Sequence, residues 1–163
     1  NEVTEKLFMK YRTLDDYARA TTRTFERDIY STGFYHVKTK NILRTAKILK
    51  TKHNGTVPRT MDEILTLPGV ARKTANIVLG RAYGVIEGIA VDTHVRRLSG
   101  LLGLTTSKNP IIIERDLMKL IPKKDWAKIS YLLIEYGRKY CKALPHKHNN
   151  CPLKDFHNHL ERE

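Results

Sequence analysis

The chain has 163 residues and two cysteines, and 30 Lys and Arg against 17 Asp and Glu give a formal net charge of +13 at pH 7. This length suits one domain with at most a small appendage. Two cysteines exclude a disulfide scaffold, and no apolar run reaches the roughly 18–20 residues that span a bilayer. The charge favours a polyanionic partner, nucleic acid ahead of an anionic membrane surface. We expect an intracellular monomer, since free thiols persist in reducing compartments and no signal peptide opens the sequence.

The first part of the chain is predicted to be helical. Residues 13–16 and 60–63 both have the pattern of a capping box, in which a hydroxyl and an acid three residues later satisfy the first amides of a helix. Residues 38–53 form a long helical segment, and Asn54-Gly55 ends it. These signals predict helices that begin after Thr13 and after Thr60.

The second part of the chain continues the helical pattern. Residues 71–79 read as a mostly apolar helix, and residues 93–98 as another. Pro110 suits the first turn of a helix that extends to Leu120. Asp125 is placed to cap a helix through Tyr136. No convincing strand run appears, so we predict an all-α fold.

The stretch LPGVARKTAN, residues 67–76, places Arg72 and Lys73 where a helix begins. The amino end of a helix carries partial positive charge, so cations there are disfavoured by roughly 0.3–1 kcal/mol each. Either they bind an anion, such as a DNA phosphate at the exposed helix amides, or one of them loses its proton. The alternative is an ordinary turn with solvated cations.

This stretch resembles the helix-hairpin-helix of the endonuclease III family of DNA glycosylases. Nineteen residues beyond Lys73, Val91-Asp92-Thr93-His94 is similar to the second signature of that family, and Tyr136-Gly137-Arg138 continues the likeness. The resemblance extends over residues 1–157. It implies a helical glycosylase domain over residues 1–140, in which the hairpin occupies about 60–83 and the terminal helices can pack as a separate lobe. A cluster-like loop and tail follow over residues 141–163.

The resemblance also implies an activity and a catalytic pair. In the family, the lysine at the position of Lys73 attacks the sugar C1′ carbon, expels a damaged base and forms a Schiff base that permits β-elimination at the abasic site. An ordinary lysine, with a pKa of about 10.4, is almost fully protonated at pH 7, so we expect burial to assist this amine. Asp92 would stabilise the developing sugar cation, whereas taken alone it reads as a helix cap. The implied partner is double-stranded DNA that contains damaged bases, above all oxidised pyrimidines, or abasic sites.

Six further positions match residues that contact DNA in the resembled family. Phe34 stands at the wedge position that fills the gap left by a flipped nucleotide, although a Phe packed in the core of its own hairpin is the alternative. The others are Gly69, Ala71, Arg72, Thr74 and His94. The family usually has Gly where Ala71 stands, which requires a negative φ at this residue. His94 also reads as a structural hydrogen-bonding residue.

The tail contains Cys141, His148, Cys151 and His157, with the x6, x2 and x5 spacing of the four cysteines that hold a [4Fe–4S] cluster in many family members. Two imidazoles disfavour such a cluster, which normally takes four thiolates. Two Cys and two His suit tetrahedral zinc. A tail that holds no metal is an equal alternative.

Compared with the resembled family, the sequence begins late, and we expect it to lack the N-terminal helix and a gap-filling polar residue of the family. The prediction is a bifunctional glycosylase and AP lyase of base excision repair. One rival is a helix-hairpin-helix module that binds DNA without catalysis. The other is a mismatch glycosylase that acts on uracil or thymine.

Overall fold

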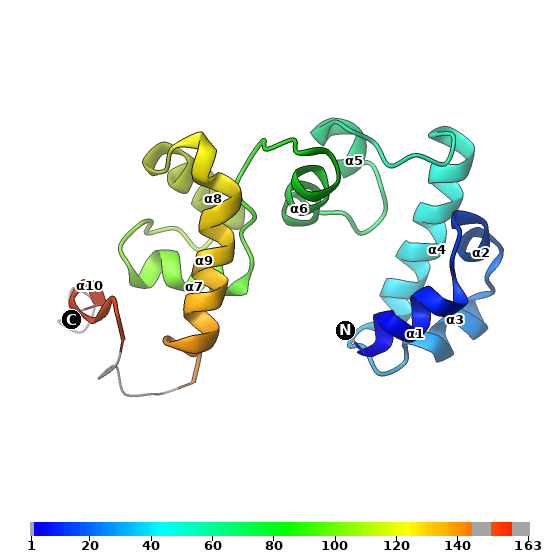
Figure 1. Cartoon of the computed structure of the whole chain (residues 1–163), viewed down its shortest axis with the longest axis horizontal. Helices are drawn as coiled ribbons and strands as arrows, with labels where there is room; N and C mark the ends of the chain where they lie inside the picture. Colours follow the sequence, from blue (N-terminus) through cyan, green and yellow to red (C-terminus); the bar gives the residue numbers. More distant parts are fainter. Residues whose placement is uncertain (1, 145–150, 158–163) are drawn as a thin grey trace. The chain divides into compact units, whose positions relative to one another are not determined.

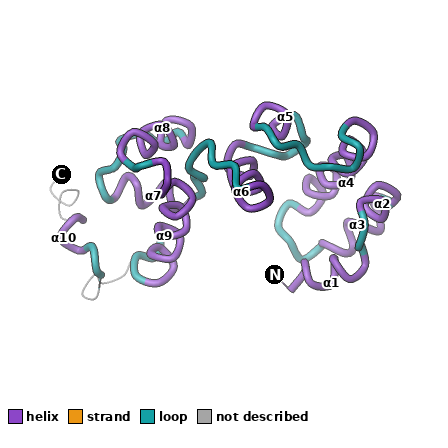
Figure 2. The backbone as a smooth tube through the Cα atoms, turned by 45° about the horizontal axis from the view of Figure 1, so that its top comes forward, coloured by secondary structure: helices purple, strands orange, loops and turns teal. Residues whose placement is uncertain are grey.

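A computed structural model describes residues 2–144 and 151–157, with the side chains of residues 155 and 157 excepted (Figure 1). Among these residues every regular element is a helix, as the tube in Figure 2 shows, so the all-α prediction is confirmed. The chain divides into two compact units, Asn1–Ala71 and Arg72–Glu163. A domain boundary at residue 140 stays a prediction.

The first unit is built around a long helix. Its elements are α1 (Glu2–Lys10), α2 (Leu14–Arg19), α3 (Thr22–Ile29), α4 (Tyr35–Lys52) and α5 (Met61–Leu65). Helices α2 and α3 pack on α4, and α1 packs on α3 (Figures 1 and 2). The core gathers the buried side chains of Leu7, Tyr11, Phe25, Ile29 and Leu43. The rings of Tyr11 and Phe25 meet edge to face at 5.1 Å, a preferred aromatic geometry.

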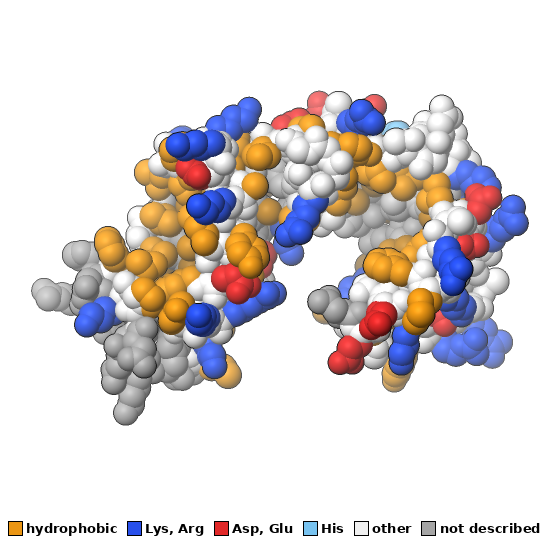
Figure 3. Space-filling model, in the orientation of Figure 1, with side chains coloured by type: hydrophobic (Ala, Val, Ile, Leu, Met, Phe, Trp, Pro, Cys, Tyr) orange, Lys and Arg blue, Asp and Glu red, His pale blue; other side chains and the backbone are white. Residues whose placement is uncertain are grey.

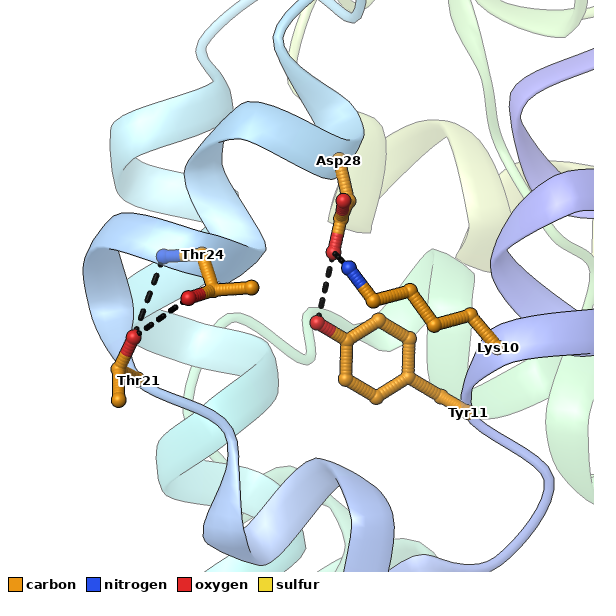
Figure 4. A network of polar contacts seen from close by, with 5 residues as sticks. All are labelled: Lys10, Tyr11, Thr21, Thr24 and Asp28. Carbon is orange, nitrogen blue, oxygen red and sulfur yellow. Dashed lines mark hydrogen bonds and ion pairs between the residues drawn. The ribbon is translucent and has the colours of Figure 1, made fainter.

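A carboxylate connects α1 to α3 at the edge of this core. Asp28 accepts hydrogen bonds from Lys10 Nζ at 2.6 Å and from Tyr11 Oη at 2.7 Å (Figure 4). The Asp28 side chain is 18% exposed. Burial alone would raise the pKa of this carboxyl, but the hydrogen bonds from Lys10 and Tyr11 outweigh it, and the pKa of Asp28 lies below its ordinary value. The same burial and contact raise the pKa of Tyr11.

We expect Asp28→Asn to lower the free energy of unfolding by about 1–2 kcal/mol at pH 7, since it removes charge-assisted hydrogen bonds. The contribution of a carboxyl with a lowered folded-state pKa is complete above its unfolded pKa of about 3.9 and is lost as the pH falls through the lower folded value. Urea unfolding at pH 7 and at pH 2–3 measures this difference. A D28N penalty that is unchanged at the acidic pH would contradict the assignment.

The second unit carries the remaining helices. They are α6 (Arg72–Tyr83), α7 (Thr93–Leu101), α8 (Pro110–Leu120), the 3-10 turn η1 (Lys123–Asp125), α9 (Trp126–Lys139) and α10 (Lys154–His157). Helix α7 packs on α8 and α9. The core contains Ile89, Val91, Val95, Leu98, Ile113, Leu117, Leu133 and Cys141. It therefore joins the segment that precedes α7 to the three longer helices that follow.

The predicted helix starts are largely confirmed. Thr13 and Thr60 accept hydrogen bonds from the amides of the residues three positions later, and Pro110 begins α8. Asn54 and Gly55, both with positive φ, follow the end of α4. The expected cap at Asp125 is wrong: its side chain makes no capping hydrogen bond, because this residue ends the 3-10 turn η1 that leads directly into α9.

The described surface is basic with scattered apolar side chains. Figure 3 shows hydrophobic side chains at the surface of both units among those of Lys and Arg. They include Phe8 and Met9 on α1 and Tyr131 and Leu132 on α9. Of the helices within the described ranges, none has the length and apolar character needed to cross a membrane.

Candidate functional site

A pocket of about 280 Å³ opens in the second unit between α6, α9 and the segment before α7. Its apolar wall is formed by Ile77, Ile86, Ala90, Ala127, Tyr131 and Ile134. Its polar lining is formed by Lys73, Asn76, Arg81, Asp92 and Ser130. The pocket thus contains both residues of the predicted catalytic pair.

Lys73 is the second residue of α6 and lies on the wall of this pocket with Asn76, Ile77 and Gly80, as expected for one face of a helix. Lys73 is exposed in this chain. The expected burial of the amine is therefore wrong, since the first turn of α6 faces the open mouth of the pocket and not the core. Any desolvation of this amine has to come from a bound partner.

Asp92 lies on the same pocket and also begins a helix. Its Oδ1 accepts a hydrogen bond from the amide of Val95 at 2.8 Å, which makes Asp92 the N-cap of α7. Ser130 on α9 donates to the backbone oxygen of Ala90 at 2.9 Å and fixes the preceding segment. The cap holds the carboxylate in one place and leaves Oδ2 available for chemistry toward the pocket.

Arg72, the first residue of α6, pairs within the protein. Its Nε donates to Glu114 Oε2 at 2.6 Å, and Asn76 Nδ2 donates to Glu114 Oε1 at 2.9 Å. The Glu114 side chain is 5% exposed and that of Arg72 is 37% exposed. Glu114 thus compensates a cation at the start of a helix, which neither of the two expected explanations includes. A contact between Arg72 and DNA stays a prediction.

The turn before α6 belongs to the first unit. Gly69 has a φ of +75°, and a Cβ there would lie 2.5 Å from Asn41 Nδ2 on α4, so the site requires glycine. Thr45 Oγ1, also on α4, donates to Pro68 O at 3.2 Å. Ala71 is exposed and keeps a negative φ, as its side chain requires.

Thr74 and His94 have different surroundings in the second unit. Thr74 is exposed in the first turn of α6. His94 is half-buried on α7, and its Nδ1 is buried without a hydrogen-bond partner. A Cβ at Gly137 would lie 2.7 Å from this Nδ1, so α9 approaches the ring closely at a glycine. This packing supports a structural role for His94, and its role in DNA binding stays a prediction.

Phe34 is 87% exposed and precedes α4 with a φ of +57°. This left-handed conformation is a genuine outlier for a bulky side chain. The alternative of a Phe packed in the core of its own hairpin is wrong, because the side chain is directed to the surface. An exposed aromatic ring on a strained backbone is typical of a functional position.

In the tail, both thiols are buried close to Tyr136. Arg97 Nη1 lies 3.4 Å from Cys141 Sγ, and Tyr136 Oη lies 2.7 Å from Cys151 Sγ. Burial first, and then the contact with Cys151, raises the pKa of Tyr136. The two cysteines are thus brought to one place at the end of α9.

The side chains that could complete a metal site are not described. His148 lies outside the described residues, and only the backbone of His157, in α10, is described. Among the described side chains, no three from His, Cys, Asp and Glu gather as metal ligands. Because the chain has two cysteines, its donor set does not fit a four-thiolate [4Fe–4S] cluster.

Sequence reasoning missed Glu114 and Gly88, which lie at the back of the pocket. A Cβ at Gly88 would overlap Glu114 Oε1, so these two residues are in close approach. The available signal was the position of Glu114 at core spacing with Ile113 and Leu117, both fully buried. A carboxylate on the buried face of a helix requires a partner, and the sequence does not say which residue provides it.

The family is decided by residues 1–123, which match the HhH-GPD superfamily of base excision DNA repair proteins. The chain belongs to this family. Endonuclease III of Synechocystis sp. is 48% identical over 153 residues, which cover 94% of this chain and 70% of that protein. The predicted base excision repair enzyme, a DNA glycosylase and AP lyase, is thereby confirmed as a class.

Solved structures of the family agree with the fold. A trapped endonuclease III–DNA covalent intermediate in an estranged-adenine complex is 45% identical with a TM-score of 0.89, over 94% of this chain and 72% of that one. A non-covalent endonuclease III–DNA complex is 42% identical with a TM-score of 0.91, over 99% and 78%. The helix-hairpin-helix glycosylase fold is therefore confirmed.

Proposed function

We propose that this chain removes damaged bases from double-stranded DNA and cleaves the resulting abasic site, with Lys73 as nucleophile and Asp92 as its carboxylate partner. One observation carries the proposal: the two side chains, far apart in sequence, line one pocket of the second unit. The net charge of +13 supports a DNA partner. The DNA complexes of the two related structures support the same partner.

The chemistry follows from an amine and a carboxylate at one sugar. The Lys73 amine attacks C1′, the glycosidic C–N bond breaks, and the base leaves as its protonated form. Asp92 stabilises the positive charge that develops on the sugar. The sugar ring opens to an imine, loss of a C2′ proton expels the 3′ phosphate, and water then hydrolyses the imine to release the free amine.

Borohydride trapping on a duplex with one abasic site tests this proposal, because borohydride reduces an imine to a stable amine. A covalent protein–DNA band is expected, with cleavage of the strand when borohydride is omitted. Binding to the duplex without a trapped band or cleavage would support the rival, a DNA-binding module without catalysis.

Phe34 is proposed as the wedge that fills the stack after the nucleotide leaves it. Because the side chain is exposed, Phe34→Ala should change the free energy of unfolding by less than about 0.5 kcal/mol. Excision from a fully paired duplex should fall about 10-fold or more, and excision at a mismatched, already weakened pair should fall less, because extrusion there costs less. Phe8→Ala, at another exposed aromatic residue, should affect neither rate. Equal losses on both substrates would contradict a wedge.

The proposed substrate class is an oxidised pyrimidine, and family membership supports it. Single-turnover excision of thymine glycol, compared with uracil and thymine opposite guanine, tests this choice. Faster release of the oxidised base is expected. Faster release of mismatched uracil or thymine would instead support the mismatch glycosylase.

For the tail we propose zinc, held by Cys141, Cys151 and the two histidine positions 148 and 157. The two buried thiols at Tyr136 support it, and two Cys with two His are a suitable tetrahedral set. Elemental analysis of the purified chain should give one zinc per molecule, and a strong chelator should lower Tm. Absence of metal would support the metal-free alternative, and iron with acid-labile sulfide would support a cluster.

A further inference from the structure

Glu114 on α8 is a buried charge whose partners all belong to the walls of the proposed active site. The residue is 4% exposed. A buried carboxylate is costly unless it is paired and hydrogen-bonded. Here both oxygens are occupied, Oε2 by Arg72 at 2.6 Å and Oε1 by Asn76 at 2.9 Å.

The two donors come from one face of one helix. Arg72 and Asn76 are four residues apart on α6, so they lie one above the other on the same side. Lys73 stands between them in the chain, in the first turn of the helix. Fixing Arg72 and Asn76 to one carboxylate therefore fixes the rotation and height of the turn that carries Lys73.

The same carboxylate touches the segment that leads to Asp92. A Cβ at Gly88 would overlap Glu114 Oε1 and would lie 3.0 Å from Asn76 Nδ2. Gly88 therefore allows the backbone four residues before Asp92 to lie directly against the Glu114–Asn76 pair. Gly88, Asn76, Lys73 and Asp92 all line the pocket.

We propose that Glu114 is a positioning residue that holds the Lys73 turn of α6 and the Gly88–Asp92 segment at the separation that the reaction requires. This inference rests on the proposed roles of Lys73 and Asp92. Glu114 acts through Arg72, Asn76 and Gly88 and does not touch the DNA. It should therefore affect the rate of the chemical step and leave DNA affinity nearly unchanged.

Glu114→Gln is the sharpest variant, because it keeps the shape of the side chain and removes one acceptor. A Gln side chain has one acceptor oxygen, so it can accept from Arg72 or from Asn76 but not from both. Asp116→Asn is the matched control on the same helix, where the carboxylate accepts from Thr105 Oγ1 at 2.6 Å, outside the pocket. Gly88→Ala is a second variant, since its methyl group displaces Glu114 from the other side.

Two quantities are measured on duplex DNA: the single-turnover cleavage rate at an abasic site, and the affinity for a tetrahydrofuran abasic analogue that cannot form an imine. For E114Q and G88A we expect the rate to fall about 10- to 100-fold, as for a displaced catalytic group, and the affinity to change less than about threefold. For D116N both quantities should stay within about threefold of wild type. In an E114A background, G88A should add less than about threefold, because the overlap is gone.

Two results would overturn the inference while the proposed function stands. One is a wild-type chain that cleaves and an E114Q variant that cleaves equally fast. The other is a parallel loss of rate and affinity in E114Q, which is the mark of general structural damage. A wild-type chain that neither cleaves nor traps would overturn the proposed function itself.

Discussion

Lys73→Gln should abolish the trapped band and lower the cleavage rate at an abasic site by at least about 10³-fold, equivalent to about 4 kcal/mol. The physical reason is that the imine requires a primary amine, which glutamine does not have. Lys73 is exposed at the mouth of the pocket, so the substitution should leave the fold intact. The measurement is single-turnover cleavage with and without borohydride.

Lys119→Gln is the matched control for this experiment. It removes the same charge from the end of α8, where the Lys119 side chain is 79% exposed and lies 3.9 Å from Asp116. Its trapping yield should equal that of wild type. A trapped band that survives in K73Q would show that another amine forms the imine, and Lys73 would then serve only phosphate binding.

Asp92→Asn should lower the excision rate about 10²–10⁴-fold while it changes the free energy of unfolding by less than about 0.5 kcal/mol. Asp92 has two roles that this variant separates. Asparagine caps a helix about as well as aspartate, so the hydrogen bond from the Val95 amide should persist. The negative charge, which the reaction would use, is lost.

Asp92→Ala completes the comparison, since it removes both the charge and the cap. It should be as inactive as D92N and should also lose about 1 kcal/mol of stability. Urea unfolding and single-turnover excision together distinguish the two roles. Near wild-type excision by D92N would mean that Asp92 is a cap and nothing more.

The local structure was predictable because it depends on neighbouring residues. Helix starts follow from side chains that reach an amide two or three positions away, as at Thr13 and Asp92. Asp125 shows the limit of this reasoning: its position suggested a cap, but the preceding residues formed a 3-10 turn that takes its place. The wedge position at Phe34 followed from the family pattern, and the structure contributed its exposure.

The sequence by itself determined the helical fold, the family and the pair Lys73 and Asp92, because each is written in residues close together or in a fixed motif. The tertiary structure alone decided which groups surround that pair. It paired Arg72 with Glu114, 42 residues away, and placed Gly88 against the same carboxylate. It also left Lys73 exposed where burial was expected. Such contacts join helices that are distant in the chain, and hydrophobic periodicity specifies which face is buried but not which partner that face meets.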